Sequence, residues 1–375
     1  MRQPPSGAWI LVLEDSRKAG MGGGQRGTIE IIDALSPHYA LLLGDTSETG
    51  RFAEAADRRG LPRILLRATR RLSTGGALNL DWREYMAYPF HLVSNLIRLR
   101  RALRGRASTA SDTLVYVGHK KQLPLARLIQ LLWGIGYVAH ARTIDPRDHR
   151  LFGFLRHLYA RARRVVAVSR AVAENLRLPN VLVLPNPLTL EVAASPKAAT
   201  EPFVVGVFAS LIDSKGIDVF MRSHPLLRHA EEITYEIYGT GPMEEVYRRL
   251  ESSRVRLMGW TDRVPQVMAE RIALTCVPST TPESFGRVVL EGFSQGIPCV
   301  ASDLGGVREL IEDGVNGLLV PPGDPQALAE SIDRLYEDRD ARERLGRGSL
   351  ETARRFGYAR YADRVREVFR DAYRG

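Results

Sequence analysis

Two glutamates in the second half of the chain have a spacing that could serve nucleotide chemistry. Residues 282–292 read PESFGRVVLEG, so Glu283 and Glu291 lie eight positions apart. The segment follows a strand expected to end at Val277, and a helix is expected over 286–295. The first amides of that helix would lack intrahelical acceptors and could bind a diphosphate. Glu291, about two turns into the helix, could accept hydrogen bonds from ribose hydroxyls.

A lysine lies in an equivalent loop earlier in the same half. Residues 207–218 read VFASLIDSKGID, with Lys215 between the strand expected over 203–208 and a following helix. A lysine beside a helix N-terminus can stabilise a diphosphate leaving group without a metal ion. Lys215 is therefore a candidate for that role.

Two further loops could approach the same ligand. Gly239 and Gly241 lie in YGTGP (238–242), which follows a strand and opens a helix. Trp260 and Thr261 follow the strand expected over 255–258. Glycines at such a turn let the backbone approach a nucleotide, but a tight connection is the alternative reading.

The first half offers a glycine-rich loop and three polar strand-end residues. GMGGGQRG (20–27) follows the strand expected over 9–13 and precedes an apolar helix over 28–35, although its spacing differs from a dinucleotide fingerprint. A merely flexible loop is the alternative. His119, His140 and Arg142 lie at or just past strand ends, where open α/β sheets place ligand groups. A single histidine there is also commonly a structural hydrogen-bonding residue.

Short apolar runs alternate with longer amphipathic segments, which predicts an α/β protein with two parallel sheets. The expected strands of the first sheet are 9–13, 39–43, 63–66, 113–117, 137–141, 165–169 and 181–184. Those of the second are 203–208, 233–238, 255–258, 272–277, 299–302 and 317–320. An aperiodic linker separates them, so the expected domains are 1–191 and 192–357. An amphipathic helix over 358–375 is expected to return to the first domain.

Composition limits the class of protein and its partners. The 375 residues carry a net charge of +10, of which 1–190 contribute about +15 and the rest about −5. The basic half favours an anionic partner: a membrane surface, a phosphorylated or lipid-linked acceptor, or nucleic acid. For the arginines of 98–106, a solvated helix end is preferred over a membrane patch. No apolar run of 18 residues occurs, and the start does not read as a signal peptide, so a cytoplasmic location is expected.

Cys276 and Cys299 each lie in an apolar strand-like run, where a thiol is a small core residue. Neither a disulfide framework nor a zinc site is indicated. The sequence Asp338-Arg339-Asp340 lies in a charged helical tail and is interpreted as solvated surface. No metal centre is expected.

The segment around Glu283 resembles the Glu, seven residues, Glu signature of retaining glycosyltransferases of the GT-B fold, specifically family 4 (glycosyl transferases group 1). The similarity continues through GIP (296–298), DLGGVRE (303–309) and DGVNGLLV (313–320). The resemblance implies two Rossmann-like domains and transfer of a hexosyl group from an NDP-sugar, with UDP or GDP as the nucleotide, to a hydroxyl acceptor. A polysaccharide or lipid-linked acceptor, reached from the cytoplasm or the inner membrane surface, is expected, and no metal cofactor.

By the same resemblance, Glu283 contacts the sugar, Glu291 holds the ribose and Lys215 binds the diphosphate. Either His140 or Arg142 lies near the sugar, and Asn186 belongs to the interdomain hinge. The full set of implied donor-binding residues is Gly23, Gly24, Lys215, Gly239, Gly241, Trp260, Thr261, Glu283, Ser284, Phe285, Gly286, Arg287 and Glu291. This chain departs from the pattern at Ser210, where the family usually has an arginine. Arg287 or Arg26 is expected to replace that charge, or diphosphate binding is weaker.

Two rival functions remain at this point. An NDP-sugar 2-epimerase shares the two-domain fold but transfers nothing; the matched segments favour a transferase. A nucleic-acid-binding protein would use the basic half, but its arginines are scattered over several helices without interleaved aromatic residues. No nucleic-acid partner is therefore expected.

Overall fold

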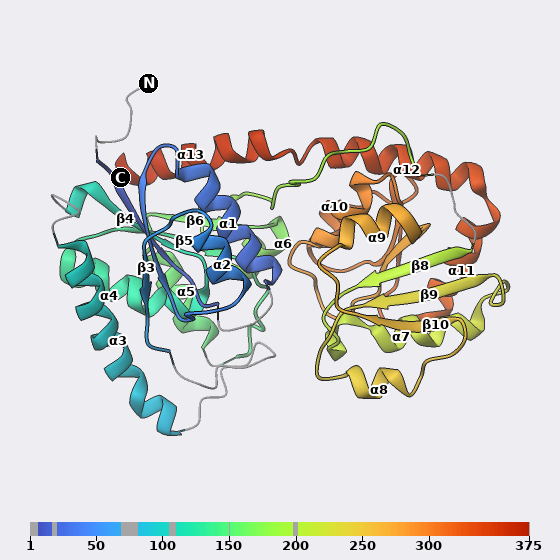
Figure 1. Ribbon diagram of the computed structural model, residues 1–375, viewed down its shortest axis with the longest axis horizontal. Helices are drawn as coiled ribbons and strands as arrows, with labels where there is room; N and C mark the ends of the chain where they lie inside the picture. The colour runs from blue at the N-terminus through green and yellow to red at the C-terminus, as the bar shows by residue number, and fades with distance from the viewer. Residues whose placement is uncertain are drawn as a thin grey trace. The chain divides into compact units, whose positions relative to one another are not determined.

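The protein is described here from a computed structural model that covers residues 1–375. The structure describes residues 7–16, 21–68, 82–104, 110–149, 151–197 and 202–374. The chain divides into two compact units, 1–184 with 359–375, and 185–358. The boundary expected between 191 and 192 lies inside the irregular segment with which the second unit begins. In each unit, helices pack around a central sheet of parallel strands (Figure 1).

The first unit is built on a seven-stranded sheet of order β3-β2-β1-β4-β5-β6-β7, in which neighbouring strands pair in parallel. Its strands are β1 (Trp9–Leu13), β2 (Ala40–Asp45), β3 (Arg63–Leu65), β4 (Thr113–Val117), β5 (Tyr137–Ala141), β6 (Arg164–Ala167) and β7 (Val181–Val183). Its α-helices are α1 (Gly23–Leu35), α2 (Arg51–Asp57), α3 (Trp82–Leu103), α4 (Leu123–Trp133), α5 (Phe152–Ala160), α6 (Arg170–Leu176) and α13 (Tyr358–Arg374). The strand order reverses between β1 and β4.

The second unit has a six-stranded parallel sheet of order β10-β9-β8-β11-β12-β13, with the reversal between β8 and β11. Its strands are β8 (Phe203–Phe208), β9 (Ile233–Tyr238), β10 (Val255–Gly259), β11 (Leu274–Val277), β12 (Cys299–Ser302) and β13 (Gly317–Val320). Its α-helices are α7 (Ile217–Ser223), α8 (Glu244–Arg248), α9 (Val264–Arg271), α10 (Arg287–Ser294), α11 (Pro325–Glu337) and α12 (Arg339–Arg354). The predicted α/β class with two parallel sheets is confirmed.

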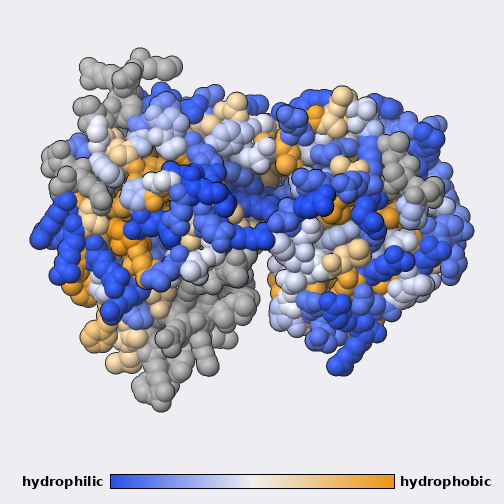
Figure 2. All heavy atoms as spheres, in the orientation of Figure 1, coloured by the Kyte–Doolittle hydropathy of each residue, from blue (hydrophilic) through white to orange (hydrophobic). Residues whose placement is uncertain are grey.

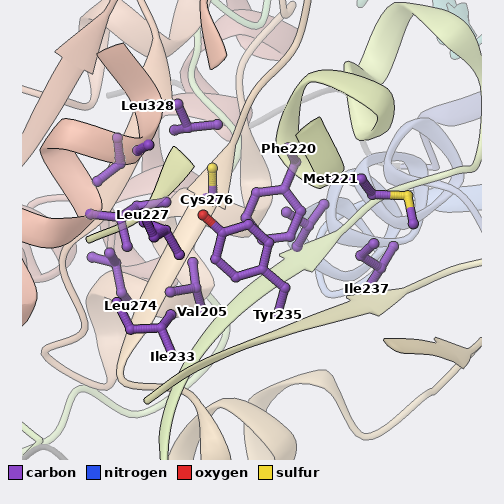
Figure 3. Close-up of a cluster of buried hydrophobic side chains, with 14 of the residues drawn as sticks. Val205, Phe220, Met221, Leu227, Ile233, Tyr235, Ile237, Leu274, Cys276 and Leu328 are labelled. Carbon is purple, nitrogen blue, oxygen red and sulfur yellow. The ribbon is translucent and has the colours of Figure 1, made fainter. Parts of the chain in front are cut away.

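The core of the second unit explains why its central strands are largely apolar. Strands buried on both faces need side chains that pack in both directions. Phe220 of α7 stacks on Tyr235 of β9 with ring centroids 4.0 Å apart (Figure 3). The Tyr235 hydroxyl lies 3.0 Å from Ser223 Oγ. Cys276 belongs to this cluster, and both cysteines are buried and unpaired with one another, as expected of core residues.

The terminal helix α13 packs on the first unit, as its apolar stripe predicts. Tyr373 stacks on Tyr39 with centroids 5.6 Å apart, and its hydroxyl donates to the Trp9 carbonyl at 2.6 Å. Phe369 contacts Tyr116 of β4, with centroids 5.8 Å apart. Arg163 donates to the carbonyl of Ala372 at 3.0 Å. Within the described ranges, no helix combines the length and apolar character needed to cross a bilayer.

Candidate functional site

The loops after β8 and β11 lie side by side in the second unit because those strands pair at the point where the strand order reverses. Both strands run in the same direction, so their carboxyl ends open at one edge of the sheet. Open α/β sheets bind ligands at this position, since the loops on either side diverge to opposite faces. Lys215 follows β8 and Glu283 follows β11.

Lys215 and Glu283 meet at this edge. Lys215 Nζ donates to Glu283 Oε1 at 2.5 Å, and both side chains are partly exposed. Ser279 Oγ donates to the same carboxylate oxygen, also at 2.5 Å. The carboxylate is therefore oriented by two donors from different loops. The arrangement places one positive and one negative side chain within reach of a single ligand.

Backbone contacts fix the two loops against each other. Thr280 N donates to the Ser214 carbonyl at 3.1 Å. Gly216, beside Lys215, has a φ of +63°, and a Cβ placed there would lie 2.0 Å from the Pro278 carbonyl oxygen. Only glycine permits that conformation and that approach together. The position of Lys215 thus depends on its neighbour lacking a side chain.

The loop after β9 is hydrogen-bonded to the loop after β8. Leu211 N donates to the Thr240 carbonyl at 3.0 Å, and Gly239 N donates to the Gly259 carbonyl at 2.8 Å. A Cβ at Gly239 would come within 1.8 Å of the Ala209 carbonyl oxygen, and one at Gly241 within 2.3 Å of the Leu211 carbonyl oxygen. At both glycines the backbone packs closely against the loop after β8, and a side chain would overlap with that loop. This packing explains why glycine occupies both positions without invoking a ligand.

Trp260 and Thr261 follow β10, one strand farther from the lysine than β9. The Trp260 side chain is exposed, and Thr261 Oγ1 accepts from Arg263 N at 3.0 Å. Neighbouring strands lie about 4.8 Å apart, so β10 is roughly 10 Å from β8 across the sheet. That separation suits a nucleoside whose diphosphate lies at Lys215.

Helix α10 begins at Arg287, with Gly286 as the preceding cap residue, one residue later than expected. Glu291 is the fifth residue of the helix, so it lies about one turn from the helix start rather than the expected two, and it is partly exposed. Phe285 is buried, its ring 6.0 Å from that of Phe356, so it can offer a ligand only its backbone.

The loop before α10 is held by the loop after β12. The Glu283 carbonyl accepts from Gly306 N at 2.7 Å, and Glu283 forms a bridge with Gly305. Ser284, between Glu283 and the buried Phe285, is partly exposed. Ser210, at the position that departs from the resembling pattern, is exposed in the loop after β8. Arg287 lies at the start of α10, and Arg26 lies in α1 of the first unit.

In the first unit, Arg142 is the centre of a hydrogen-bonded cluster at the reversal between β1 and β4. Its guanidinium lies 3.6 Å from Glu14 Oε2, and Thr28 Oγ1 donates to the same Glu14 oxygen. The guanidinium donates to the Gly24 carbonyl, to Thr28 Oγ1 at 2.7 Å, to the Gly118 carbonyl at 3.1 Å and to the Tyr116 hydroxyl at 2.6 Å. These contacts occupy both terminal nitrogens of the guanidinium and give Arg142 a positioning role, whereas its buried Nε has no hydrogen-bond partner among the described residues.

The two histidines are likewise engaged by the protein. His140 is buried, and its Nδ1 lies 2.8 Å from the Tyr116 hydroxyl. His119 Nδ1 accepts from Lys121 N at 3.3 Å and caps a short 3-10 turn. Burial lowers the pKa of His119 to about 4, so this imidazole is neutral near pH 7. Asn186 is buried within the second unit.

The glycine-rich segment differs from the expected loop. Helix α1 begins at Gly23 rather than Thr28, so Gly23 and Gly24 form its first turn. Gln25 explains the early start: its side-chain oxygen accepts from Gly22 N at 2.9 Å, which satisfies a backbone donor at the helix entrance. Gly20 lies outside the described residues. The carbonyl of Gly24 is fixed by Arg142.

Burial raises the pKa of the Glu14 carboxyl from 4.5 to about 7, although the Arg142 guanidinium opposes the shift. Because the folded pKa of Glu14 exceeds the unfolded one, the stability contributed by this carboxyl is fully present below about pH 4.5 and is lost as pH rises to about 7. At about 1.4 kcal/mol per tenfold change in proton affinity, the loss amounts to roughly 3 kcal/mol. Urea unfolding of wild type and Glu14→Gln between pH 4.5 and 8 should show this loss in wild type only. Parallel pH profiles would contradict the assignment.

Several residues of the two clusters were not singled out from the sequence. Ser279 follows β11 four positions before Glu283, and Glu14 directly follows the apolar strand β1. A polar residue within two positions of the end of a buried strand was the available signal for both. Tyr116 and Thr28 carried no such signal, since each lies inside a largely apolar element.

Part of the chain is similar in sequence to known glycosyltransferases. Residues 202–338 match the family model described as glycosyl transferases group 1. Phosphatidyl-myo-inositol mannosyltransferase of Mycobacterium leprae is 31% identical over 159 residues, 41% of this chain and 42% of that protein. D-inositol 3-phosphate glycosyltransferase of Nocardioides is 37% identical over 115 residues, 29% of this chain and 25% of that protein. The chain thus aligns with less than half the length of these relatives.

Solved structures extend the similarity to the whole fold. HepE of Anabaena, crystallised with UDP and glucose, superposes with a TM-score of 0.79 at 22% identity, covering 96% of this chain and 99% of that one. The fold is therefore GT-B, two Rossmann-like units of which the second carries the Lys215–Glu283 pair. In sequence, the similarity to the glycosyl transferases group 1 family extends over residues 202–338.

Proposed function

We propose that the protein is a retaining glycosyltransferase that moves a hexosyl group from a UDP- or GDP-sugar to a hydroxyl acceptor. The observation that carries the proposal is the convergence of Lys215 and Glu283 at the strand reversal of the second unit. The family match over residues 202–338 supports transferase chemistry. The UDP bound to HepE supports a nucleotide-sugar donor.

The leaving group sets the main chemical demand. Negative charge grows on the diphosphate as the glycosidic bond breaks, and fixed positive groups stabilise that charge without having to reorganise. Lys215 provides a full charge, and the first amides of α10 provide donors at the positive end of the helix dipole. Arg287, at the start of α10, is the candidate for the charge missing at Ser210.

The Glu283 carboxylate is paired with Lys215 in the structure and is proposed to contact the donor sugar once the diphosphate is bound. A diphosphate arriving at Lys215 competes with Glu283 for the ammonium group, now 2.5 Å from the carboxylate. Once Lys215 turns to the phosphates, the carboxylate is available to sugar hydroxyls and to the positive charge that develops on the sugar. Ser279 keeps the carboxylate in place through this exchange. Glu291 and Trp260 are assigned to the ribose and the base, respectively.

In a retaining reaction of this kind, the acceptor attacks the face that the diphosphate leaves, so no side-chain nucleophile is required. The departing phosphate, held by Lys215, takes the acceptor proton. A divalent ion is not required in this scheme, since the cationic and amide donors neutralise the leaving group. The acceptor is proposed to be a polysaccharide or lipid-linked glycan, presented on the cytoplasmic side of a membrane.

A thermal-shift screen of nucleoside diphosphates and their sugars tests the donor assignment. A ligand present at 100 times its Kd stabilises the folded state by about 2.7 kcal/mol, so a UDP or GDP compound is expected to raise the Tm by several degrees. Adenosine diphosphate serves as the charge-matched control. No shift with any uridine or guanosine compound would contradict the proposal.

Release of the nucleoside diphosphate distinguishes transfer from epimerisation. A transferase releases the diphosphate in proportion to added acceptor, with only slow hydrolysis in its absence. A 2-epimerase would change the sugar without an acceptor. Diphosphate release that does not respond to any glycan or lipid-linked acceptor, together with a new sugar isomer, would reject the transferase.

A further inference from the structure

Helix α3 of the first unit has two apolar faces. One face contacts its own unit: Leu99 is fully buried, and buried Asn95 accepts from Arg67 N at 2.7 Å and donates to the Arg67 carbonyl at 2.9 Å. A helical residue two positions from another points about 200° away from it. Val93 and Ile97, two positions before Asn95 and Leu99, therefore lie on the opposite side of the helix. A helix of a globular protein normally carries polar residues there.

The opposite face of α3 is instead strongly apolar. Met86, Phe90, Val93 and Ile97 recur at intervals of four, three and four residues, so they form one stripe along the helix. Their exposed fractions are 65%, 73%, 55% and 48%. Isolated exposed apolar residues need no explanation, but a contiguous stripe of four large ones marks an interaction surface.

The same stripe becomes basic toward the C-terminal end of α3. Continuing the spacing from Ile97 leads to Arg101 and then Arg104, with Arg98 and Arg100 beside them. No acidic residue occurs between Met86 and Arg104. Figure 2 shows hydrophobic residues beside strongly hydrophilic ones along the edge of the first unit that α3 forms in Figure 1. The surface thus combines an apolar section and a cationic section in one line.

A shallow groove on this surface joins the two sections. It has a volume of about 630 Å³ and is lined by Arg67, Phe90, Val93, Ile97, Arg98 and Arg101, among others. One lining arginine is already anchored, since Arg98 donates to the Leu65 carbonyl at 3.0 Å. Apolar and cationic side chains around one groove match a ligand with an acyl part and an anionic head.

We propose that the exposed face of α3 docks on an anionic lipid bilayer, with Met86 to Ile97 entering the acyl boundary and Arg101 and Arg104 contacting head groups. An interfacial helix of this type binds through buried apolar area together with attraction to anionic lipid. Each basic side chain near such a surface adds to the attraction. The proposal deepens the membrane-linked acceptor of the proposed function by naming the surface that reaches it.

Two other occupants fit the same face less well. A nucleic acid would bind the arginines through its phosphates. It would gain little affinity from the apolar stripe, because only Phe90 of the four side chains can stack on a base. A second copy related by a twofold axis across the middle of this face would lie antiparallel, so the arginines of each copy would be buried on the apolar section of the other without acidic partners. The bilayer alone accounts for both sections of the stripe.

Vesicle flotation tests the proposal with full-length variants. Wild type is expected to float with phosphatidylcholine vesicles that contain roughly 30% phosphatidylglycerol. This binding should be lost at high salt. Phe90→Glu with Val93→Glu, and separately Arg101→Glu with Arg104→Glu, should each weaken binding by at least about tenfold. Val246→Glu with Leu250→Glu, which alters two exposed apolar residues of the second unit, is the matched control and should bind as wild type does.

Equal vesicle binding by wild type and the Phe90/Val93 variant would overturn the proposal. Oligonucleotide binding that is lost in the Arg101/Arg104 variant but kept in the Phe90/Val93 variant would instead indicate a nucleic-acid partner. A wild-type dimer in sedimentation that dissociates in the Phe90/Val93 variant would instead indicate a second copy of the chain. Nucleotide-induced thermal shift in the same variants separates the two claims. Loss of vesicle binding with an intact nucleotide shift supports the surface, whereas absence of any nucleotide shift in wild type counts against the donor site alone.

Discussion

Replacing Lys215 by methionine is expected to lower kcat/KM for sugar transfer by about 10³-fold. Removing one preorganised donor from a developing anion typically reduces turnover by roughly 10² to 10³, and Lys215 carries a full charge. The ammonium group is 2.5 Å from Glu283, so its loss also leaves that carboxylate without its cationic partner at the site. Methionine keeps the length and apolar stem of the side chain. Initial rates of nucleoside diphosphate release, measured with acceptor present, give the comparison.

Two further variants separate charge from general damage. Arg222→Met removes an exposed cation on α7, the helix that follows Lys215, where it pairs with Asp218 at 2.8 Å. That variant should keep wild-type kcat/KM. Lys215→Arg restores the charge and should recover part of the lost rate. If Lys215→Met retains activity within about threefold of wild type, the lysine does not stabilise the leaving group.

Replacing Gly216 by alanine is expected to damage both the fold and the site. The residue has a φ of +63°, and the new Cβ would lie 2.0 Å from the Pro278 carbonyl oxygen. That oxygen belongs to the backbone, so no side-chain rotation can relieve the overlap, and the loops after β8 and β11 must separate. We expect the free energy of unfolding to fall by about 2 to 4 kcal/mol. Because a displacement near 1 Å can cost about 10²-fold in rate, transfer should fall at least that far.

Gly314→Ala isolates the conformational part of this effect. Gly314 has a φ of +73° in the same unit, and a Cβ there would meet no atom within 4 Å. Its replacement should cost only about 1 to 2 kcal/mol, with transfer unchanged. Chemical unfolding and initial-rate measurements on both variants provide the test. Similar losses in the two alanine variants would show that the approach to Pro278 has no special role.

The sequence predicts the fold well because its signals are local and repeated. Most strands of the two sheets are short, largely apolar runs, and the apolar stripe of α13 already indicates a helix that packs on another element. The order of the motifs also brings Lys215 and Glu283 to one sheet edge, since both follow strands that a doubly wound topology places side by side. Ion pairing between them follows from topology rather than from sequence proximity.

Tertiary contacts explain what the sequence leaves open. The choice between His140 and Arg142 depends on which way a strand-end side chain turns, and the structure turns Arg142 toward Glu14 and Thr28. The early start of α1 depends on a hydrogen bond from Gly22 to Gln25 that residue types alone do not require. For the arginines after residue 97, the sequence favoured a solvated helix end. The adjoining apolar stripe becomes significant only when α3 is seen to bury its other face.

The most direct test of the account is a crystal structure with the nucleoside diphosphate that gives the largest thermal shift. The account predicts diphosphate oxygens within hydrogen-bonding distance of Lys215 Nζ and of the first amides of α10, with Glu283 facing the sugar side. A diphosphate bound elsewhere, with Lys215 still paired to Glu283, would contradict it.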